Sequence, residues 1–158
     1  MLRRGVFAAV ALSLAVPAAA QDKQPPYWAS IASGQAMTRA GPGRNYPGIW
    51  LYQRRDLPIR VVKKYENWRM IEDPDGERGW MLVSLLSDRR TAIVKPGEPR
   101  PIHVSADGAS RVRYTAEHGV VGRIEKCRDG WCHITIGKRE GYIRAADIWG
   151  ASDGEVVD

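Results

Sequence analysis

Short hydrophobic runs separated by polar turns occur along most of this chain, and no segment shows a sustained helical period. The runs have the length of β-strands and recur at roughly 8–12-residue spacing, with Gly, Pro, Asn and Asp gathered between them. Such spacing is typical of small barrels and sandwiches. The hydrophobic pattern therefore predicts an all-β protein.

One supersecondary pattern occurs twice along the sequence. In the first copy Trp68 is followed by Gly79-Trp80, and the second copy repeats this order at Trp131 and Gly141. Each copy contains a turn, an aromatic residue, a short apolar strand, a charged turn, a Gly-aromatic pair and another short strand. A repeated structural unit defines the architecture, so we expect two small β modules in tandem.

The repeats and the turn-rich segments divide the chain into five parts. Within the part that precedes the first module, residues 27–31 are expected to add a short edge strand, and residues 92–94 are compatible with either module. The acidic end of the chain is expected to fray. The five parts are a signal peptide (1–20), an N-terminal arm (21–34), a first module (35–90), a second, divergent module (91–150) and an acidic tail (151–158).

The first twenty residues have the pattern of a secretory signal peptide. Arg3 and Arg4 form a basic start, residues 5–16 form an apolar stretch, and small residues lead up to Ala20. The stretch is too short to span a bilayer, and it lacks the polar face that a buried amphipathic helix would show. We therefore expect an exported protein, periplasmic or secreted, whose mature chain begins at Gln21.

The mature chain is moderately basic. Removal of Arg3 and Arg4 with the signal peptide lowers the formal net charge from +6 to +4. This charge favours contact with anionic surfaces, but an exported protein seldom meets nucleic acid, so we expect no nucleic-acid partner. No second apolar run is long enough to predict a transmembrane segment in the mature chain. Basic residues concentrate in the first module, either as an ordinary solvated face or as a contact for an anionic partner, at Arg54, Arg55, Arg60, Lys63, Lys64 and Arg69.

Cys127 and Cys132 are the two cysteines of the chain. An even number of cysteines in an exported protein favours a disulfide, and the Asp-Gly turn between them predicts a hairpin that brings both strands within about 5 Å. Two free buried thiols are the second possibility. A zinc site would need two further ligands, and His133 faces away from Cys132 in a strand.

The segment from Arg39 to Pro47, with the sequence RAGPGRNYP, resembles a loop of the bacterial SH3-like (SH3b) domain of exported envelope proteins. Trp68 and Gly79-Trp80 match the later part of the same family pattern. The resemblance is strong in the first module, and the second keeps only its later half. It implies two tandem small SH3-like β-barrels and non-catalytic attachment to the cell wall or to protein partners.

The turn-rich loop and the aromatic residues that follow it are the candidate ligand-binding surface of the first module. Aromatic rings along a shallow groove bind sugar faces or extended peptides through flat contacts, and an arginine beside them can pair with the carboxylate of a peptide stem. Alternatively, Trp68 and Trp80 fill the core and rim of the barrel. The candidate residues are Arg44, Tyr46, Trp50, Trp68 and Trp80.

The sequence contains no motif for an enzyme. It lacks a nucleophile elbow, a glycine-rich phosphate loop and histidines at metal-ligand spacing, so we expect no catalytic residue, cofactor or metal. Two hypotheses of different classes remain. The chain is either a binding module for cell-wall polymer or a periplasmic protein, or a structural or regulatory subunit of an envelope assembly without a small ligand.

The first prediction is cleavage after Ala20. Small residues follow the apolar stretch there, which is the arrangement that signal peptidase requires. Intact mass and N-terminal sequencing of protein from the envelope fraction should identify Gln21 as the first residue. An uncleaved chain in the cytoplasm would contradict both export and the argument for a disulfide.

Overall fold

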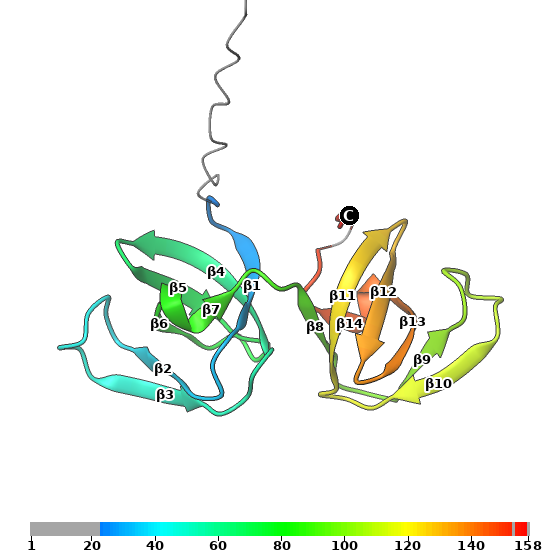
Figure 1. Ribbon diagram of the computed structural model, residues 1–158, viewed down its shortest axis with the longest axis horizontal. Helices are drawn as coiled ribbons and strands as arrows, with labels where there is room; N and C mark the ends of the chain where they lie inside the picture. The colour runs from blue at the N-terminus through cyan, green and yellow to red at the C-terminus, as the bar shows by residue number, and fades with distance from the viewer. Residues whose placement is uncertain (1–22, 153, 158) are drawn as a thin grey trace, which may run out of the picture.

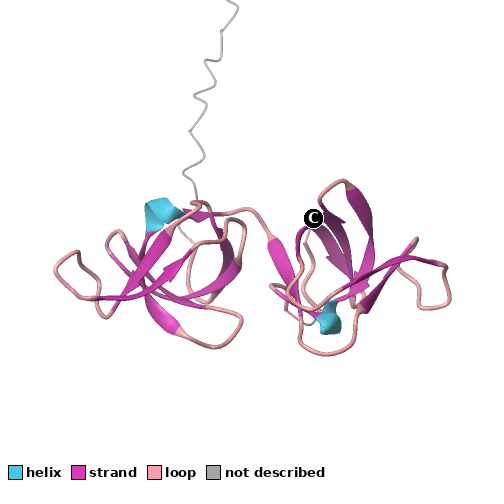
Figure 2. Cartoon of the chain, turned by 90° about the horizontal axis from the view of Figure 1, so that it is seen from below, coloured by secondary structure: helices cyan, strands magenta, loops and turns pink. Residues whose placement is uncertain are grey.

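The computed structural model describes residues 23–152 and 154–157, which form two seven-stranded antiparallel sheets. Each sheet is coiled into a small barrel, and the two barrels lie side by side, joined by a short linker (Figures 1 and 2). The prediction of an all-β fold with two small barrels is therefore confirmed. The expected signal peptide lies outside the described residues.

The strands of the first barrel have the spatial order β3-β2-β6-β5-β4-β1-β7. A 3-10 helix, Val83–Leu85, separates the last two strands in sequence. The strands are β1 (Tyr27–Ile31), β2 (Ala36–Arg39), β3 (Gly48–Tyr52), β4 (Pro58–Tyr65), β5 (Trp68–Glu72), β6 (Arg78–Leu82) and β7 (Leu86–Ser87).

The second barrel repeats this order as β10-β9-β13-β12-β11-β8-β14. A 3-10 helix, Ala145–Asp147, stands at the equivalent place before the last strand. The strands are β8 (Thr91–Val94), β9 (Arg100–His103), β10 (Val112–Ala116), β11 (Val121–Arg128), β12 (Trp131–Ile136), β13 (Arg139–Arg144) and β14 (Ile148–Trp149). The repeat seen in the sequence is thus a repeat of topology.

The first strand differs from the expectation of an edge strand. β1 lies between β4 and β7 and pairs with both of them. Ala29 and Ile31 on this strand are buried in the first core, so the sheet needs β1 to complete its apolar interior. β8, which the sequence left open to either module, pairs with β11 and β14 in the second barrel.

Each barrel has a hydrophobic core of its own. Alternate residues of the strands point inward, as the period of a strand requires, and burial of each such side chain contributes about 1.5–3 kcal/mol. The fully buried side chains of the first core include Ile31, Ile59, Val61, Ile71 and Met81, and those of the second include Val94, Ile102, Ile134, Ile143 and Ile148.

The glycine of each Gly-aromatic pair allows two strands to approach closely. A methyl group at Gly79 would lie 2.6 Å from Cβ of Thr38 on β2, and one at Gly141 would collide with Ile102 on β9. Real Cβ atoms do not approach this closely. Only glycine therefore permits β6 to lie beside β2, and β13 beside β9, at this distance. The glycine in the repeated motif therefore allows the β2–β3 pair, and the β9–β10 pair in the second barrel, to join the rest of its sheet.

Cys127 and Cys132 form a disulfide, as predicted. They are cross-strand partners on β11 and β12, with Cα atoms 4.1 Å apart. Asp129 and Gly130 both have positive φ, at 53° and 78°, which is the backbone conformation of a type I′ hairpin turn. Because the two sulfurs are bonded to each other, the alternatives of free thiols and a zinc site do not apply. Both cysteines are buried in the second core.

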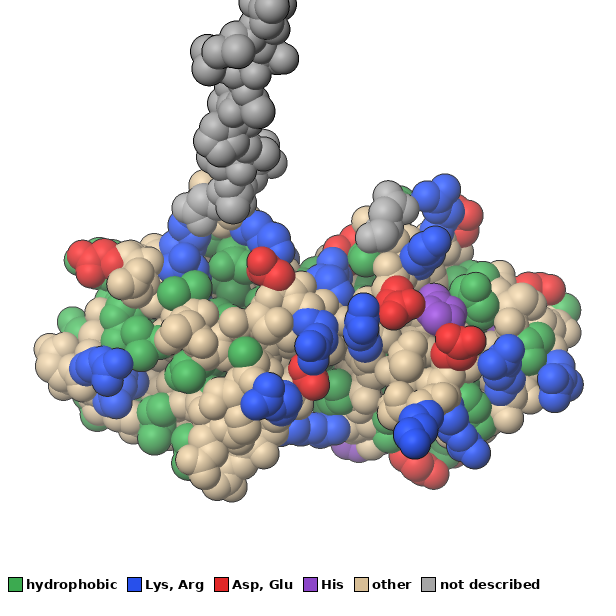
Figure 3. Space-filling view, in the orientation of Figure 1, with side chains coloured by type: hydrophobic (Ala, Val, Ile, Leu, Met, Phe, Trp, Pro, Cys, Tyr) green, Lys and Arg blue, Asp and Glu red, His purple; other side chains and the backbone are tan. Residues whose placement is uncertain are grey.

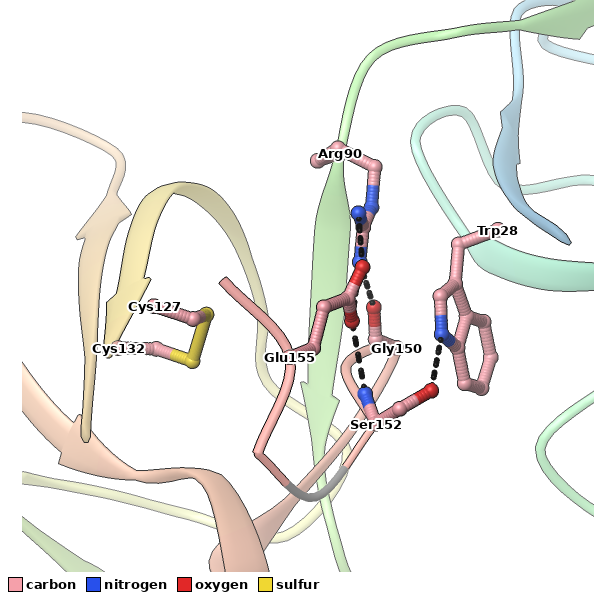
Figure 4. The surroundings of a disulfide bond; sticks show 7 residues. All are labelled: Trp28, Arg90, Cys127, Cys132, Gly150, Ser152 and Glu155. Atoms are coloured by element: carbon pink, nitrogen blue, oxygen red, sulfur yellow. Dashed lines mark hydrogen bonds and ion pairs between the residues drawn. A yellow bond between two sulfur atoms is a disulfide. The ribbon is translucent and has the colours of Figure 1, made fainter. Parts of the chain in front are cut away.

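The described part of the C-terminal tail is anchored, so the prediction that it frays is wrong there. Glu155 accepts two hydrogen bonds from Arg90 in the linker, at 2.6 and 3.1 Å (Figure 4). Val157 pairs with Cys127. Trp28 of the first barrel donates a hydrogen bond to the Ser152 hydroxyl at 3.1 Å. The tail thus connects the first barrel, the linker and the disulfide hairpin.

The second prediction concerns this anchor. Burial alone would raise the pKa of Glu155, but hydrogen bonds from the Arg90 guanidinium and the Ser152 amide outweigh it and hold the pKa below its usual range. Ionised Glu155 therefore stabilises the fold at neutral pH, and this contribution is lost as the pH falls through the lowered pKa. We expect Glu155→Gln to lower the free energy of unfolding at pH 7 by about 1–2 kcal/mol.

Thermal and urea unfolding at pH 7 and at acidic pH test this expectation. The difference between Glu155→Gln and the unmodified protein should disappear at acidic pH, because both side chains are then neutral. Glu117→Gln is the control, since Glu117 is exposed and its side chain forms no ion pair among the described residues. A difference that persists at low pH would contradict the electrostatic origin.

Candidate ligand-binding surface

The two most exposed large hydrophobic residues of the first barrel lie on β3, one of its two terminal strands. Trp50 on β3 is 63% exposed, and its neighbours Ile49 and Leu51 are 54% and 41% exposed. The strand pairs with β2 on one side, where Trp50 lies opposite Thr38. Because β3 is the last strand of the sheet, its side chains reach solvent on both faces.

One face of β3 borders a cleft between the two barrels with a volume of about 920 Å³. Trp50 and Tyr52 line it from the first barrel, and Trp149 lines it from the second. Cleft walls of mixed apolar and charged character are typical of ligand sites. The charged side chains of the lining are those of Arg54, Asp73, Asp75, Glu77, Arg78 and Lys95.

A buried hydrogen bond fixes the acidic turn on the wall of this cleft. The Tyr52 hydroxyl donates to Oδ2 of Asp73 at 2.9 Å, and Oδ1 of Asp73 accepts the backbone N–H groups of Asp75 and Glu77 at 3.0 and 2.9 Å. Burial, with a further contribution from Asp73, raises the pKa of Tyr52 above its usual range. The Tyr52–Asp73 pair therefore joins β3 to the turn before β6.

The Gly-Pro-Gly loop is shaped around the ring of Tyr46. A methyl group at Gly41 would collide with this ring, and one at Gly43 would lie 3.2 Å from it. Arg39 on β2 donates a hydrogen bond to the Tyr46 carbonyl at 2.8 Å. The glycines thus allow the ring to lie flat against the loop, and 42% of the Tyr46 side chain stays exposed.

The structure does not gather the five predicted site residues into one groove. Trp68 is only 8% exposed and belongs to the interior, whereas Trp50 borders the cleft. Trp80 is half-buried and lies opposite Arg39, on the sheet face away from Gly79 and Met81. Arg44 and Tyr46 are exposed on the loop.

Sequence reasoning missed Ile49 and Leu51, which extend the exposed surface along β3. The signal was available, because no charged residue occurs between Gly48 and Tyr52. It also missed the Tyr52–Asp73 hydrogen bond, since residues 21 apart in the chain carry no local sign of their contact. The exposed apolar surface therefore follows a strand as well as the loop.

In the second barrel, other side chains of the barrel cover the aromatic residues. Tyr114 on β10 is half-buried, with the Arg139 guanidinium 5.1 Å from its ring centroid, and burial raises its pKa. Trp131 packs edge-on against His103 at 5.3 Å and lies beneath Arg144 at 5.4 Å. Its aromatic residues are thus engaged within the barrel.

The third prediction tests the Tyr52–Asp73 hydrogen bond. Tyr52→Phe leaves the buried Asp73 carboxylate without its hydroxyl donor, so we expect a loss of about 1–3 kcal/mol in the free energy of unfolding. In the unmodified protein, stability should also fall as the pH rises above about 10, because the unfolded state releases the tyrosine proton that the folded state retains.

Urea unfolding at pH 7 and at alkaline pH measures both effects. In Tyr52→Phe, the part of the stability loss at alkaline pH that is due to Tyr52 should be absent. Tyr46→Phe is the control, since the exposed Tyr46 hydroxyl forms no hydrogen bond within the described part of the chain. Equal stability of both variants would show that the Tyr52 hydroxyl is not needed.

Among solved structures, the chain is similar to NlpC2 and NlpC1 from Trichomonas vaginalis, each at 13% identity. The matches cover 81% and 87% of this chain, with TM-scores of 0.36 and 0.35. They cover 49% and 50% of those structures, so the chain spans about half their length. No curated protein sequence matches the chain.

The sequence profile of the bacterial SH3 domain matches the chain twice, over residues 32–88 and 96–150. One match lies in each barrel, and together they cover well over half of the chain. The chain therefore belongs to the bacterial SH3 domain family.

Proposed function

We propose that this chain is a non-catalytic binding module of the bacterial cell envelope that holds peptidoglycan or an extended peptide through the first barrel. The observation that carries the proposal is the exposure of Trp50. Its ring is 63% exposed on an uncharged strand beside a cleft of about 920 Å³, while the equivalent Tyr114 is half-buried under Arg139. On β10 only Val112 is a comparably exposed apolar residue, at 44%. The larger exposed apolar surface of the first barrel points to a binding role.

The remaining candidate residues have different roles in this proposal. Tyr46 extends the apolar surface along the loop, and the exposed Arg44 pairs with a carboxylate of the ligand. Trp80 forms the rim beside Arg39. Trp68 supports the barrel from inside and does not touch the ligand, because it is buried.

The family and the disulfide indicate an extracytoplasmic protein. None of the described residues forms a helix of the length and hydrophobicity that a membrane crossing needs. Our proposal adds that the chain is periplasmic and that a signal peptide is removed near Ala20.

A specific observation also favours the second candidate function, a structural subunit of an envelope assembly. The tail and linker hold the two barrels together through Arg90, Glu155 and Trp28, an arrangement that a rigid spacer would need. Such a subunit requires no exposed aromatic anchor, so binding by Trp50 distinguishes the two functions.

The fourth prediction follows from the exposed ring. Trp50→Ala should weaken retention on purified peptidoglycan at least about tenfold, because an aromatic anchor in a binding surface contributes about 2 kcal/mol or more. Co-sedimentation of the protein with sacculi at increasing concentrations measures this affinity. Thermal unfolding should be nearly unchanged, since the ring is largely exposed.

Tyr65→Ala is the matched control. Tyr65 is 53% exposed at the end of β4 in the same barrel and does not line the cleft. Tyr65→Ala should leave retention on peptidoglycan unchanged. Equal loss in both variants would argue against a specific surface at β3, and no retention of the unmodified protein would favour the structural subunit.

A further inference from the structure

We infer that β3 is a docking edge for an extended polypeptide with acidic ends, which adds to the first sheet as a further strand. The inference rests on the proposed function, because the same surface binds the ligand in both. It goes further by naming the ligand class, a polypeptide, and the mode of contact, backbone pairing along the open side of β3.

The first step is the open edge itself. Within the described part of the chain, β3 pairs with β2 and with no other strand. Its far side therefore presents backbone N–H and C=O groups to solvent. Figure 1 shows β3 along the lower margin of the first barrel, where no other element covers it. An uncovered edge of this kind is a template for an added strand.

β3 lacks the charged residues that usually protect an exposed sheet edge. Folded proteins place charged residues on their exposed sheet edges to prevent pairing with other chains. Residues 48–52 carry no charge, and Ile49, Trp50 and Leu51 are all exposed. Met37 on β2 lies opposite Leu51 and is 36% exposed, which widens the apolar surface.

The corresponding strand of the second barrel, β10, has a different edge. β10 is the corresponding terminal strand of the second barrel, and Tyr114 lies opposite Ile102 there as Trp50 lies opposite Thr38. Both pairings have a register shift directly before these aromatic residues. The extra residue is Ile49 in the first barrel.

In the second barrel the extra residue is Arg113, which is exposed and donates a hydrogen bond to the Glu140 carbonyl. Thr115 stands where β3 has Leu51. The space-filling view agrees, because charged side chains are denser over the second barrel than around the β2–β3 hairpin (Figure 3). The fold tolerates a protected edge, so the bare edge of β3 is not a requirement of the fold.

The charged residues around β3 identify the occupant. Arg44 precedes β3, and Arg54 and Arg55 follow it. Arg54 donates a hydrogen bond to the Gly119 carbonyl of the second barrel at 2.7 Å. A second copy of the chain paired along this edge would bring its own arginines to the same place, and like charges would repel. A peptide with Asp or Glu at its ends neutralises them. On the cleft wall, the Asp73 carboxylate already accepts the Tyr52 hydroxyl. The exposed Arg44 and Arg55 carry the selection for an acidic peptide.

The probe is a synthetic fluorescent peptide of alternating valine and threonine with two glutamates at each end. Titration with the full mature chain, followed by fluorescence anisotropy, should show saturable binding. Two altered peptides should bind at least tenfold more weakly. In one, every central backbone nitrogen is methylated, which removes the donors for strand pairing. In the other, lysines replace the glutamates.

Protein variants locate the site. Ile49→Arg gives β3 the residue that β10 has, and it should weaken peptide binding at least tenfold. Thr115→Lys changes the equivalent edge of the second barrel and should leave binding unchanged. Thermal unfolding of both variants establishes that they are folded, and the position of Ile49 at an exposed register shift makes the substitution compatible with the barrel.

Several outcomes would overturn the inference. Equal binding of the methylated peptide would show side-chain contact without strand addition, and unchanged binding by Ile49→Arg would place the site elsewhere. Equal binding of the lysine peptide would refute the acidic occupant. A dimer of the unmodified chain in sedimentation, abolished by Ile49→Arg and without peptide binding, would identify a second copy as the occupant.

The assay on sacculi separates this inference from the proposed function. Retention that depends on Trp50, without any binding of the peptide, would refute strand addition while the binding module stands. Peptide binding that depends on Ile49, without retention on sacculi, would support strand addition and refute peptidoglycan as the ligand.

Discussion

The close contact between Thr38 on β2 and Gly79 on β6 joins the β2–β3 hairpin to the rest of the first sheet, and the position of β3 depends on it. A side chain at Gly79 would push β2 away, since even a methyl group would lie 2.6 Å from Thr38 Cβ. β2 then carries β3 as its outer partner, so β3 becomes the terminal strand. Trp80, the next residue, points to the opposite face of the sheet because side chains alternate along a strand. One glycine therefore allows β2 to hold β3 at the position where Trp50 borders the cleft.

The second constraint is the connection between the barrels. Each barrel is small and has its own core, so a short linker alone would leave their relative orientation free. Arg90 in the linker bonds both to Glu155 and to the Gly150 carbonyl, and Trp28 packs edge-on against Trp149 at 4.7 Å. These contacts explain why the tail is ordered where composition alone predicts fraying. Arg54 also donates a hydrogen bond to the Gly119 carbonyl, and Ile93 and Val121 of the second barrel pack against the first core. The cleft beside Trp50 has two walls because these contacts and the tail hold both barrels.

Much of the fold follows from the sequence because its signals are local. The repeated Gly-aromatic motif, the Asp-Gly turn and the spacing of Cys127 and Cys132 each involve residues close in the chain. The role of β1 was harder to predict, since its burial depends on pairing with β4 and β7, which lie far along the sequence. The tail shows the same limit, because Glu155 is anchored by Arg90, 65 residues away.

The candidate site was predicted less well than the fold, for a related reason. Aromatic residue type identifies possible contacts, but it does not say which side of a strand faces solvent. Trp68 and Trp50 look alike in the sequence, yet one is 8% exposed and the other 63%. The difference arises from strand position, since β5 lies inside the sheet and β3 ends it. Two identical side chains therefore serve the core and the surface.

The two barrels show how function can diverge while topology stays the same. They share the strand order, the register shift in the outer strand pair and the glycine at the close approach of two strands. The differences between them therefore lie in side chains that the fold does not constrain. A bare apolar edge exposes a protein to unwanted pairing, and flanking charges are the usual means of limiting it. Arg44, Arg54 and Arg55 flank β3 in this way, whereas β10 carries Arg113 within the strand itself. Charge at the ends restricts which chains can pair with β3, whereas charge within β10 opposes pairing altogether. The first arrangement is suited to selective binding, and the second to a barrel that serves as a packing partner.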